Sequence, residues 1–151
     1  LLAQGLRDAD PRVRARVAQR LGELGDASAV PQLMVALDRG VSEAADAIGR
    51  LGDAASVATY TSMLGRQPLE VMLAGYEHFL RRSNLPAETQ LAIVAALEDL
   101  GTDGVRAFFA RCLRDRVVTR PAIARAMEAS YQRLAPRAQK PASQAETETK
   151  P

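Results

Sequence analysis

Apolar side chains recur every three or four residues along most of this chain, the spacing that places them on one face of an α-helix. The pattern divides into eight stripes, and no stretch of strict apolar–polar alternation, the pattern of a half-buried strand, competes with them. The stripes run over residues 13–24, 30–37, 44–51, 57–64, 69–80, 91–95, 105–113 and 123–134. We therefore predict an all-α protein with eight helices.

Residues that begin and end helices fall between the stripes. Asp10 and Pro11 provide an N-cap carboxylate followed by a proline at the first helical position. Five glycines follow stripes, where a left-handed residue commonly ends a helix. They are Gly25, Gly40, Gly52, Gly65 and Gly101. Helices joined by such short loops form antiparallel hairpins.

The chain also repeats itself. The segment Leu24–Ala27 recurs as Leu51–Ala54, a shift of 27 residues, and Leu100–Asp103 is a weaker third copy. A fixed period of this length is typical of proteins built from stacked helical units. Residues 1–7 match the second helix of such a unit, so we expect the chain to be part of a longer polypeptide.

These features resemble the HEAT-repeat family in its short bacterial form, as in HEAT-like bilin lyases. The residues that carry the resemblance are 6–14 (LRDADPRVR), Ala18, 21–26 (LGELGD), 29–31 and 33–37. The resemblance implies a right-handed α-solenoid of antiparallel helix pairs, an armadillo-type superhelix, over residues 1–134. It also implies that Asp10 and Arg14 brace neighbouring repeats. The apolar repeat positions are Leu21, Leu24, Val30, Leu33 and Leu37.

One place departs from the repeat. Between a helix at 54–65 and a pair at 87–100 and 103–115 only one helix fits, at 69–82. A repeat of two helices per unit therefore leaves one helix without a partner. Either this unit is degenerate or the pairing changes here. Such irregularities alter the curvature of a solenoid and hence its binding surface. The candidate partner-binding residues at this place are Tyr76, His78, Phe79, Arg81 and Arg82.

Composition separates the C-terminal end from the rest. Residues 135–151 contain no Val, Ile, Leu, Met, Phe, Tyr or Trp, and three of them are prolines. Such a segment buries too little apolar surface to offset its ordering entropy, so we predict a disordered tail. The formal net charge of +2 is too small to indicate a nucleic-acid or membrane partner by itself.

Candidate chemistry is sparse. The single His and single Cys cannot build a zinc site from the usual ligands, and we predict no metal and no cofactor. HEAT-type metal hydroxylases bind iron through His-Glu pairs, whereas this chain has only the reversed order Glu77-His78. Cys112 lies on an apolar stripe and is predicted to be a core residue.

Arginines supply 18 of the 20 basic residues. Arg12, Arg16 and Arg20 lie four residues apart, on one exposed face of a helix. Such a face can bind phosphates or acidic protein groups. Acidic residues lie on both sides of this run in the sequence and favour a protein partner; they are Asp8, Asp10, Glu23 and Asp26.

We therefore predict a non-catalytic module for protein–protein interaction or scaffolding. Two alternatives stay open: nucleic-acid binding through the arginine faces, and a HEAT-like bilin lyase subunit. No run of about 18 apolar residues could cross a bilayer, and we expect a cytoplasmic protein with an unidentified protein partner.

Overall fold

A computed structural model describes residues 2–136 of the chain. Within that range the chain forms helices and no β-strand. The α-helices are α1 (Pro11–Leu24), α2 (Val30–Asp38), α3 (Glu43–Leu51), α4 (Ala54–Thr61), α5 (Leu69–Arg81), α6 (Ala87–Leu100), α7 (Asp103–Arg114) and α8 (Pro121–Arg133). The 3-10 helices are η1 (Leu2–Arg7) and η2 (Ala27–Ala29).

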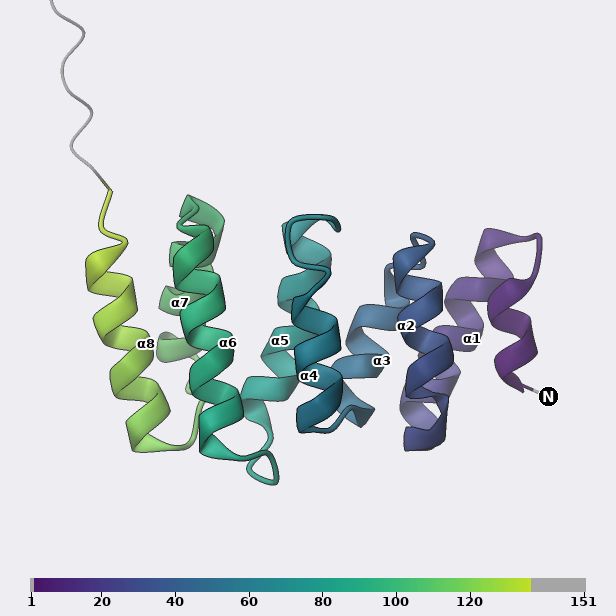
Figure 1. The fold of residues 1–151 in the computed structure, drawn as a ribbon, viewed down its shortest axis with the longest axis horizontal. Coiled ribbons are helices and arrows are strands. Elements are labelled where there is room, and N and C mark those ends of the chain that lie inside the picture. Colours follow the sequence, from purple (N-terminus) through teal and green to yellow (C-terminus); the bar gives the residue numbers. More distant parts are fainter. Residues whose placement is uncertain (1, 137–151) are drawn as a thin grey trace, which may run out of the picture.

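Successive α-helices alternate between two layers (Figure 1). Layer A contains α1, α3, α5 and α7, and layer B contains η1, α2, α4, α6 and α8, which lie in front in Figure 1. Within layer A, α3 packs against both α1 and α5; within layer B, α6 packs against α8. The prediction of an all-α solenoid of helix pairs is confirmed, and each of the eight predicted stripes lies on one of α1–α8.

The single helix predicted at 69–82 is present as α5, but the expected pairing of 87–100 with 103–115 was wrong. α5 pairs with α6 and α7 pairs with α8, so the alternation between layers continues without a gap. The signature Leu24–Ala27 follows a layer A helix, as does its copy Leu51–Ala54, whereas Leu100–Asp103 follows α6 in layer B. The sequence motif changes its place in the repeat while the helices do not, and this shifted the predicted pairing by one helix.

Most of the predicted helix ends are found. Asp10 caps α1 by accepting a hydrogen bond of 2.8 Å from the backbone N–H of Arg12. Gly25, Gly40, Gly65 and Gly101 have positive φ. The prediction for Gly52 was wrong, because its φ of −69° is ordinary extended backbone.

Small residues bring the layer A helices close together. A Cβ added to Gly22 of α1 would lie 3.0 Å from Cβ of Ala47 in α3. On the other side of α3, a Cβ on Gly49 would lie 2.9 Å from Cα of Gly75 in α5. Backbones in such close contact bury most of the surface between them, so α1, α3 and α5 form one tightly packed block.

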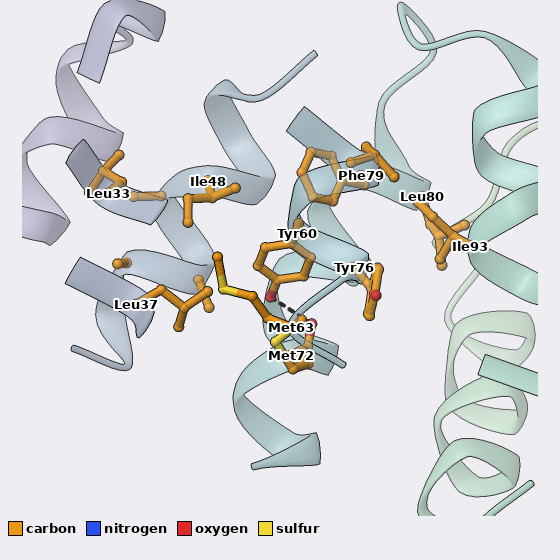
Figure 2. Close-up of a cluster of buried hydrophobic side chains, with 14 of the residues drawn as sticks. Leu33, Leu37, Ile48, Tyr60, Met63, Met72, Tyr76, Phe79, Leu80 and Ile93 are labelled. Carbon is orange, nitrogen blue, oxygen red and sulfur yellow. Dashed lines mark hydrogen bonds between the residues drawn. The ribbon is translucent and has the colours of Figure 1, made fainter. Parts of the chain in front are cut away.

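The core lies between the layers (Figure 2). Tyr60 of α4 is fully buried, and its hydroxyl donates a hydrogen bond of 2.9 Å to the backbone carbonyl of Met72. The Tyr60 ring meets Tyr76 and Phe79 edge to face, with centroids 5.1 and 5.6 Å apart. These contacts bind layer B to α5 and satisfy the one polar atom that Tyr60 brings into the core.

Four of the five apolar repeat positions are buried: Leu21, Val30, Leu33 and Leu37. The prediction for Leu24 was wrong, because its side chain is 64% exposed. α1 turns its Ala18 and Gly22 face toward its neighbours, and Leu24 lies about 120° around the helix from Ala18 at about 100° per residue. The apolar stripe therefore lies at the edge of the buried face.

A buried amide fixes the end of α5. Gln90 of α6 is 1% exposed, and its Nε2 donates to the carbonyls of Phe79, Leu80 and Arg82 at 2.8–3.1 Å. Its Oε1 accepts a hydrogen bond from Arg120, which precedes α8. The last carbonyls of α5, which no helical N–H can reach, are satisfied in this way.

An ion pair joins α6 to α8. Glu98 accepts hydrogen bonds from the guanidinium of Arg133 and from the hydroxyl of Ser130. These hydrogen bonds, with that of Arg133 the strongest, lower the pKa of Glu98 from 4.5 to about 2.

The predicted tail, 135–151, lies outside the described residues except for Ala135 and Pro136. None of the described helices has both the length and the apolar character needed to cross a membrane.

The close approach of α3 and α5 predicts that Gly75→Ala destabilises the fold. The added Cβ would lie 2.7 Å from the carbonyl oxygen of Ala45 and 2.6 Å from Cζ of Tyr60. We expect a loss of about 2 kcal/mol in the free energy of unfolding, measured by urea denaturation. Ala74→Ser, at the exposed neighbouring position, is the control and should change stability by less than about 0.5 kcal/mol. Equal stability of the two variants would contradict the close packing.

The Glu98 pair predicts a pH-dependent contribution to stability. Because the pKa is lowered by folding, the contribution is present above pH 4.5 and is lost as the pH falls toward 2. Glu98→Gln should lower the free energy of unfolding by about 1 kcal/mol at pH 7. This difference should shrink at pH 3. The exposed Glu88→Gln, also on α6, should show no such trend.

Candidate partner-binding surface

The groups with catalytic potential are engaged in structural contacts. His78 Nε2 of α5 lies 2.5 Å from Asp46 Oδ1 of α3, so this pair joins two helices of layer A. Cys112 is 1% exposed, and burial raises the pKa of its thiol to about 12. A thiol with such a pKa stays protonated near neutral pH and is a poor nucleophile. Among the described residues, no three His, Cys, Asp or Glu side chains lie where they could hold a metal ion.

Two of the predicted partner-binding residues are core residues. Tyr76 and Phe79 are completely buried between the layers, where Figure 2 shows them beside Tyr60 and Leu80. The prediction that they form a binding surface was wrong. α5 has neighbours on both sides and in the opposite layer, so the face that carries its aromatic residues has no access to solvent.

The neighbouring arginines, Arg81 and Arg82, have different environments. The Nη1 of Arg82 donates to the carbonyls of Gly49 and Gly52, at 3.2 and 2.5 Å. Arg82 therefore caps the C-terminus of α3. The side chain of Arg81 is 56% exposed and pairs with Glu77 one helical turn earlier. Only Arg81 of the two presents its charge to solvent.

The arginines predicted to be important on α1 also have different environments. Arg12, Arg16 and Arg20 are exposed on one face of α1, and Arg20 pairs with Glu23 at 2.7 Å. Arg14 donates hydrogen bonds to the carbonyls of Asp8 and Ala9 and so fixes the turn before α1. Asp10 and Arg14 thus stabilise the junction between η1 and α1.

The outward side of layer A carries charges of both signs. We call this surface the layer A face. Its charged side chains are Arg12, Arg16, Arg20, Glu23, Asp46, Arg50, Glu70, Arg81, Arg111 and Arg114. Seven of these ten side chains are basic and three are acidic, so the face carries an excess of positive charge and would attract acidic groups.

A cleft of about 660 Å³ interrupts this face between α5 and α7. Its lining residues are Pro68, Leu69, Glu70, Leu73, Gly104, Ala107, Phe108, Arg111 and Arg114. We call it the α5–α7 cleft. Its volume lies within the range of about 300–1,000 Å³ typical of ligand sites.

The cleft exists because larger residues replace the small ones at this interface. Where α3 meets α5, Gly49 faces Gly75 and the backbones touch. Where α5 meets α7, Leu73 and Phe108 line the gap, and an ion pair spans it. These side chains hold the two helices apart and leave apolar surface accessible.

Charged groups surround one end of the cleft. Glu77 of α5 pairs with Arg111 of α7 at 2.7 Å and with Arg81 at 3.0 Å. Partial burial alone would raise the pKa of Glu77, but the hydrogen bonds from Arg111 and Arg81 outweigh it and lower the pKa below its usual value. One carboxylate shared by two guanidinium groups leaves an excess positive charge beside the cleft.

Layer B has a smaller hollow of about 370 Å³ between α4 and α6. Its lining residues are Ala54, Val57, Ala58, Thr61, Glu88, Thr89, Ala92 and Ile93. α4 carries no charged residue at all. The only charged residue that lines this hollow is Glu88, so charge contributes little to the choice of a partner there. The α5–α7 cleft has three charged lining residues and is therefore the stronger candidate.

Sequence reasoning missed most of this site. Leu69 and Leu73 were assigned to a core stripe, and Ala107 carries no chemical signal of its own. The only available signal was the size of residues at facing positions, and facing positions are known only once the helices are paired.

The comparison with protein families agrees with this architecture. A family model described as HEAT repeats matches residues 1–76, half of the chain. The chain therefore belongs to the HEAT-repeat family. A search of curated proteins and a search of solved structures found no match.

The two adjacent arginines provide a direct test of their assigned roles. Arg82→Met leaves two carbonyls at the end of α3 without their donor and should lower the free energy of unfolding by about 1–3 kcal/mol. Arg81→Met removes only a surface ion pair and should cost less than about 1 kcal/mol. Both are measured by urea denaturation, and a larger loss for the Arg81 variant would refute these assignments.

Proposed function

We propose that this chain is a non-catalytic protein-binding module whose partner docks on the layer A face around the α5–α7 cleft. HEAT repeats generally mediate protein interactions. The single observation that carries the proposal for this chain is the cleft itself, an accessible apolar hollow bordered by charged residues. Apolar surface with a polar rim is the arrangement found in protein interfaces.

The alternatives have less support. Nucleic-acid binding needs basic groups that are free to neutralise phosphates, whereas Arg20, Arg50, Arg81 and Arg111 are paired with carboxylates. A bilin lyase would need a reactive group in a pocket, and no described residue provides one beside the α5–α7 cleft. The proposal therefore includes no cofactor and no bond-breaking step.

Site-specific photocrosslinking tests the proposal. A benzophenone amino acid placed at Ala107, which is exposed in the α5–α7 cleft, should give a discrete crosslinked protein band in cells that make this chain. The same amino acid at Ala95 of α6 or Ala129 of α8, both exposed in layer B, should give a much weaker band. Benzophenone reacts only with groups held against it, so the difference reports where the partner docks.

Equal labelling at all three positions would reject the layer A face as the docking surface. A crosslinked species that nuclease treatment removes would favour the nucleic-acid alternative instead. The fold of each variant is checked first by circular dichroism, because all three substitutions are at exposed helical positions and should leave the helix content unchanged.

A further inference from the structure

We propose that the occupant of the α5–α7 cleft is an amphipathic helix of a partner protein whose apolar stripe is flanked by acidic residues. This inference rests on the proposed function and names the chemistry of its partner. Four properties of the cleft support it: its length, its apolar floor, its charge and the donors left at its rim.

The length of the cleft matches a short helix. The lining residues of α7 are Gly104, Ala107, Phe108, Arg111 and Arg114. Their spacing is that of one continuous helical stripe, and at 1.5 Å per residue it extends about 15 Å. The other wall is formed by Pro68 and the first turns of α5. The α7 wall is thus about three helical turns long, and the hollow lies between two helices, the arrangement that receives a third helix.

The floor of the groove is apolar. Leu69 and Leu73 are half-buried, and Ala107 is exposed between them and the rim. Gly104 allows the Leu69 side chain to pack directly against α7, because a Cβ there would lie 2.9 Å from Cδ2 of Leu69. An incoming helix would cover this surface with apolar residues spaced three and four apart.

The charge at the rim favours acidic flanks. Arg111 and Arg114 lie at one end of the lining stripe, and Glu70 is the only acidic lining residue. The Arg114 side chain is 71% exposed, and its Nε donates to Asp115 at 3.0 Å. In the part of the chain described, no hydrogen bond engages either of its Nη atoms. A guanidinium with two free donors binds a carboxylate in a bidentate manner.

Arg111 also retains donors. Its Nη1 donates to Glu77, and its guanidinium carbon lies 5.4 Å from the centre of the Phe108 ring. The ring and the carboxylate hold this side chain at the edge of the apolar floor. An acidic residue of the incoming helix would therefore meet a pre-positioned cation, which reduces the entropy lost on binding.

The test is a selection from a displayed library of 14-residue helix-forming peptides, using the purified chain as target. Enriched peptides should carry apolar residues spaced three and four apart with Asp or Glu beside them. The best peptide is then synthesised together with a matched peptide in which each acidic residue is Lys. We expect the Lys peptide to bind at least about ten-fold more weakly, measured by fluorescence anisotropy.

Three variants of the chain locate the site. Arg114→Glu should weaken the acidic peptide about five-fold and strengthen binding of the Lys peptide. Leu73→Glu, which places a charge in the apolar floor, should weaken binding more than about ten-fold. Arg125→Glu, at an exposed position of α8, makes the same charge change outside the cleft and should leave the affinity unchanged.

Several results would overturn the inference: no enrichment, enrichment of basic peptides, or acidic peptides whose affinity is unaffected by Arg114→Glu and Leu73→Glu. Dimerisation of the chain that Leu73→Glu abolishes, without peptide enrichment, would assign the cleft to a second copy. The crosslinking result at Ala107 is independent of the peptides. A positive crosslink with no acidic peptide rejects only this occupant, whereas failure of both rejects the proposed function.

Discussion

The distance between neighbouring helices of layer A depends on the size of the residues that face one another. Gly22 and Ala47 bring α1 against α3, and Gly49 and Gly75 bring α3 against α5. Dispersion and the exclusion of water both increase as backbones approach, so this block is the most closely packed part of layer A. At the next interface Leu73 and Phe108 replace the small residues, and the α5–α7 cleft opens.

Polar groups then hold α5 in place at the border between the packed block and the cleft. Arg82 ties its end to the end of α3, and Gln90 ties the same end to α6 and, through Arg120, to the start of α8. The hydrogen bonds from Arg82 and from the Gln90 amide satisfy backbone carbonyls that the ends of helices leave without partners. These contacts fix the C-terminal end of α5, whereas the residues of α5 that line the cleft lie in its first turns.

The packing of α5 gives neighbouring residues of the same type different roles. Arg81 and Arg82 are adjacent, yet one faces solvent and the other caps a neighbouring helix. Of the residues predicted to bind a partner on α5, Tyr76 and Phe79 instead build the core. Membership of the HEAT-repeat family establishes the fold, whereas the proposed chemistry of the partner rests on this chain's own cleft.

The sequence by itself determined the helices, their ends and the stacked architecture. Local spacing of apolar residues, an N-cap such as Asp10 and a left-handed residue such as Gly25 act within one or two helical turns, so they can be recognised without knowing the fold. The exposed arginines of α1 followed from the same periodicity. The pairing of α5 with α6, the capping roles of Gln90 and Arg82, the exposure of Leu24 and the α5–α7 cleft were decided only by the tertiary structure. Each of them depends on which side chains of different helices meet, and the periodicity within one helix carries no information about contacts with another helix.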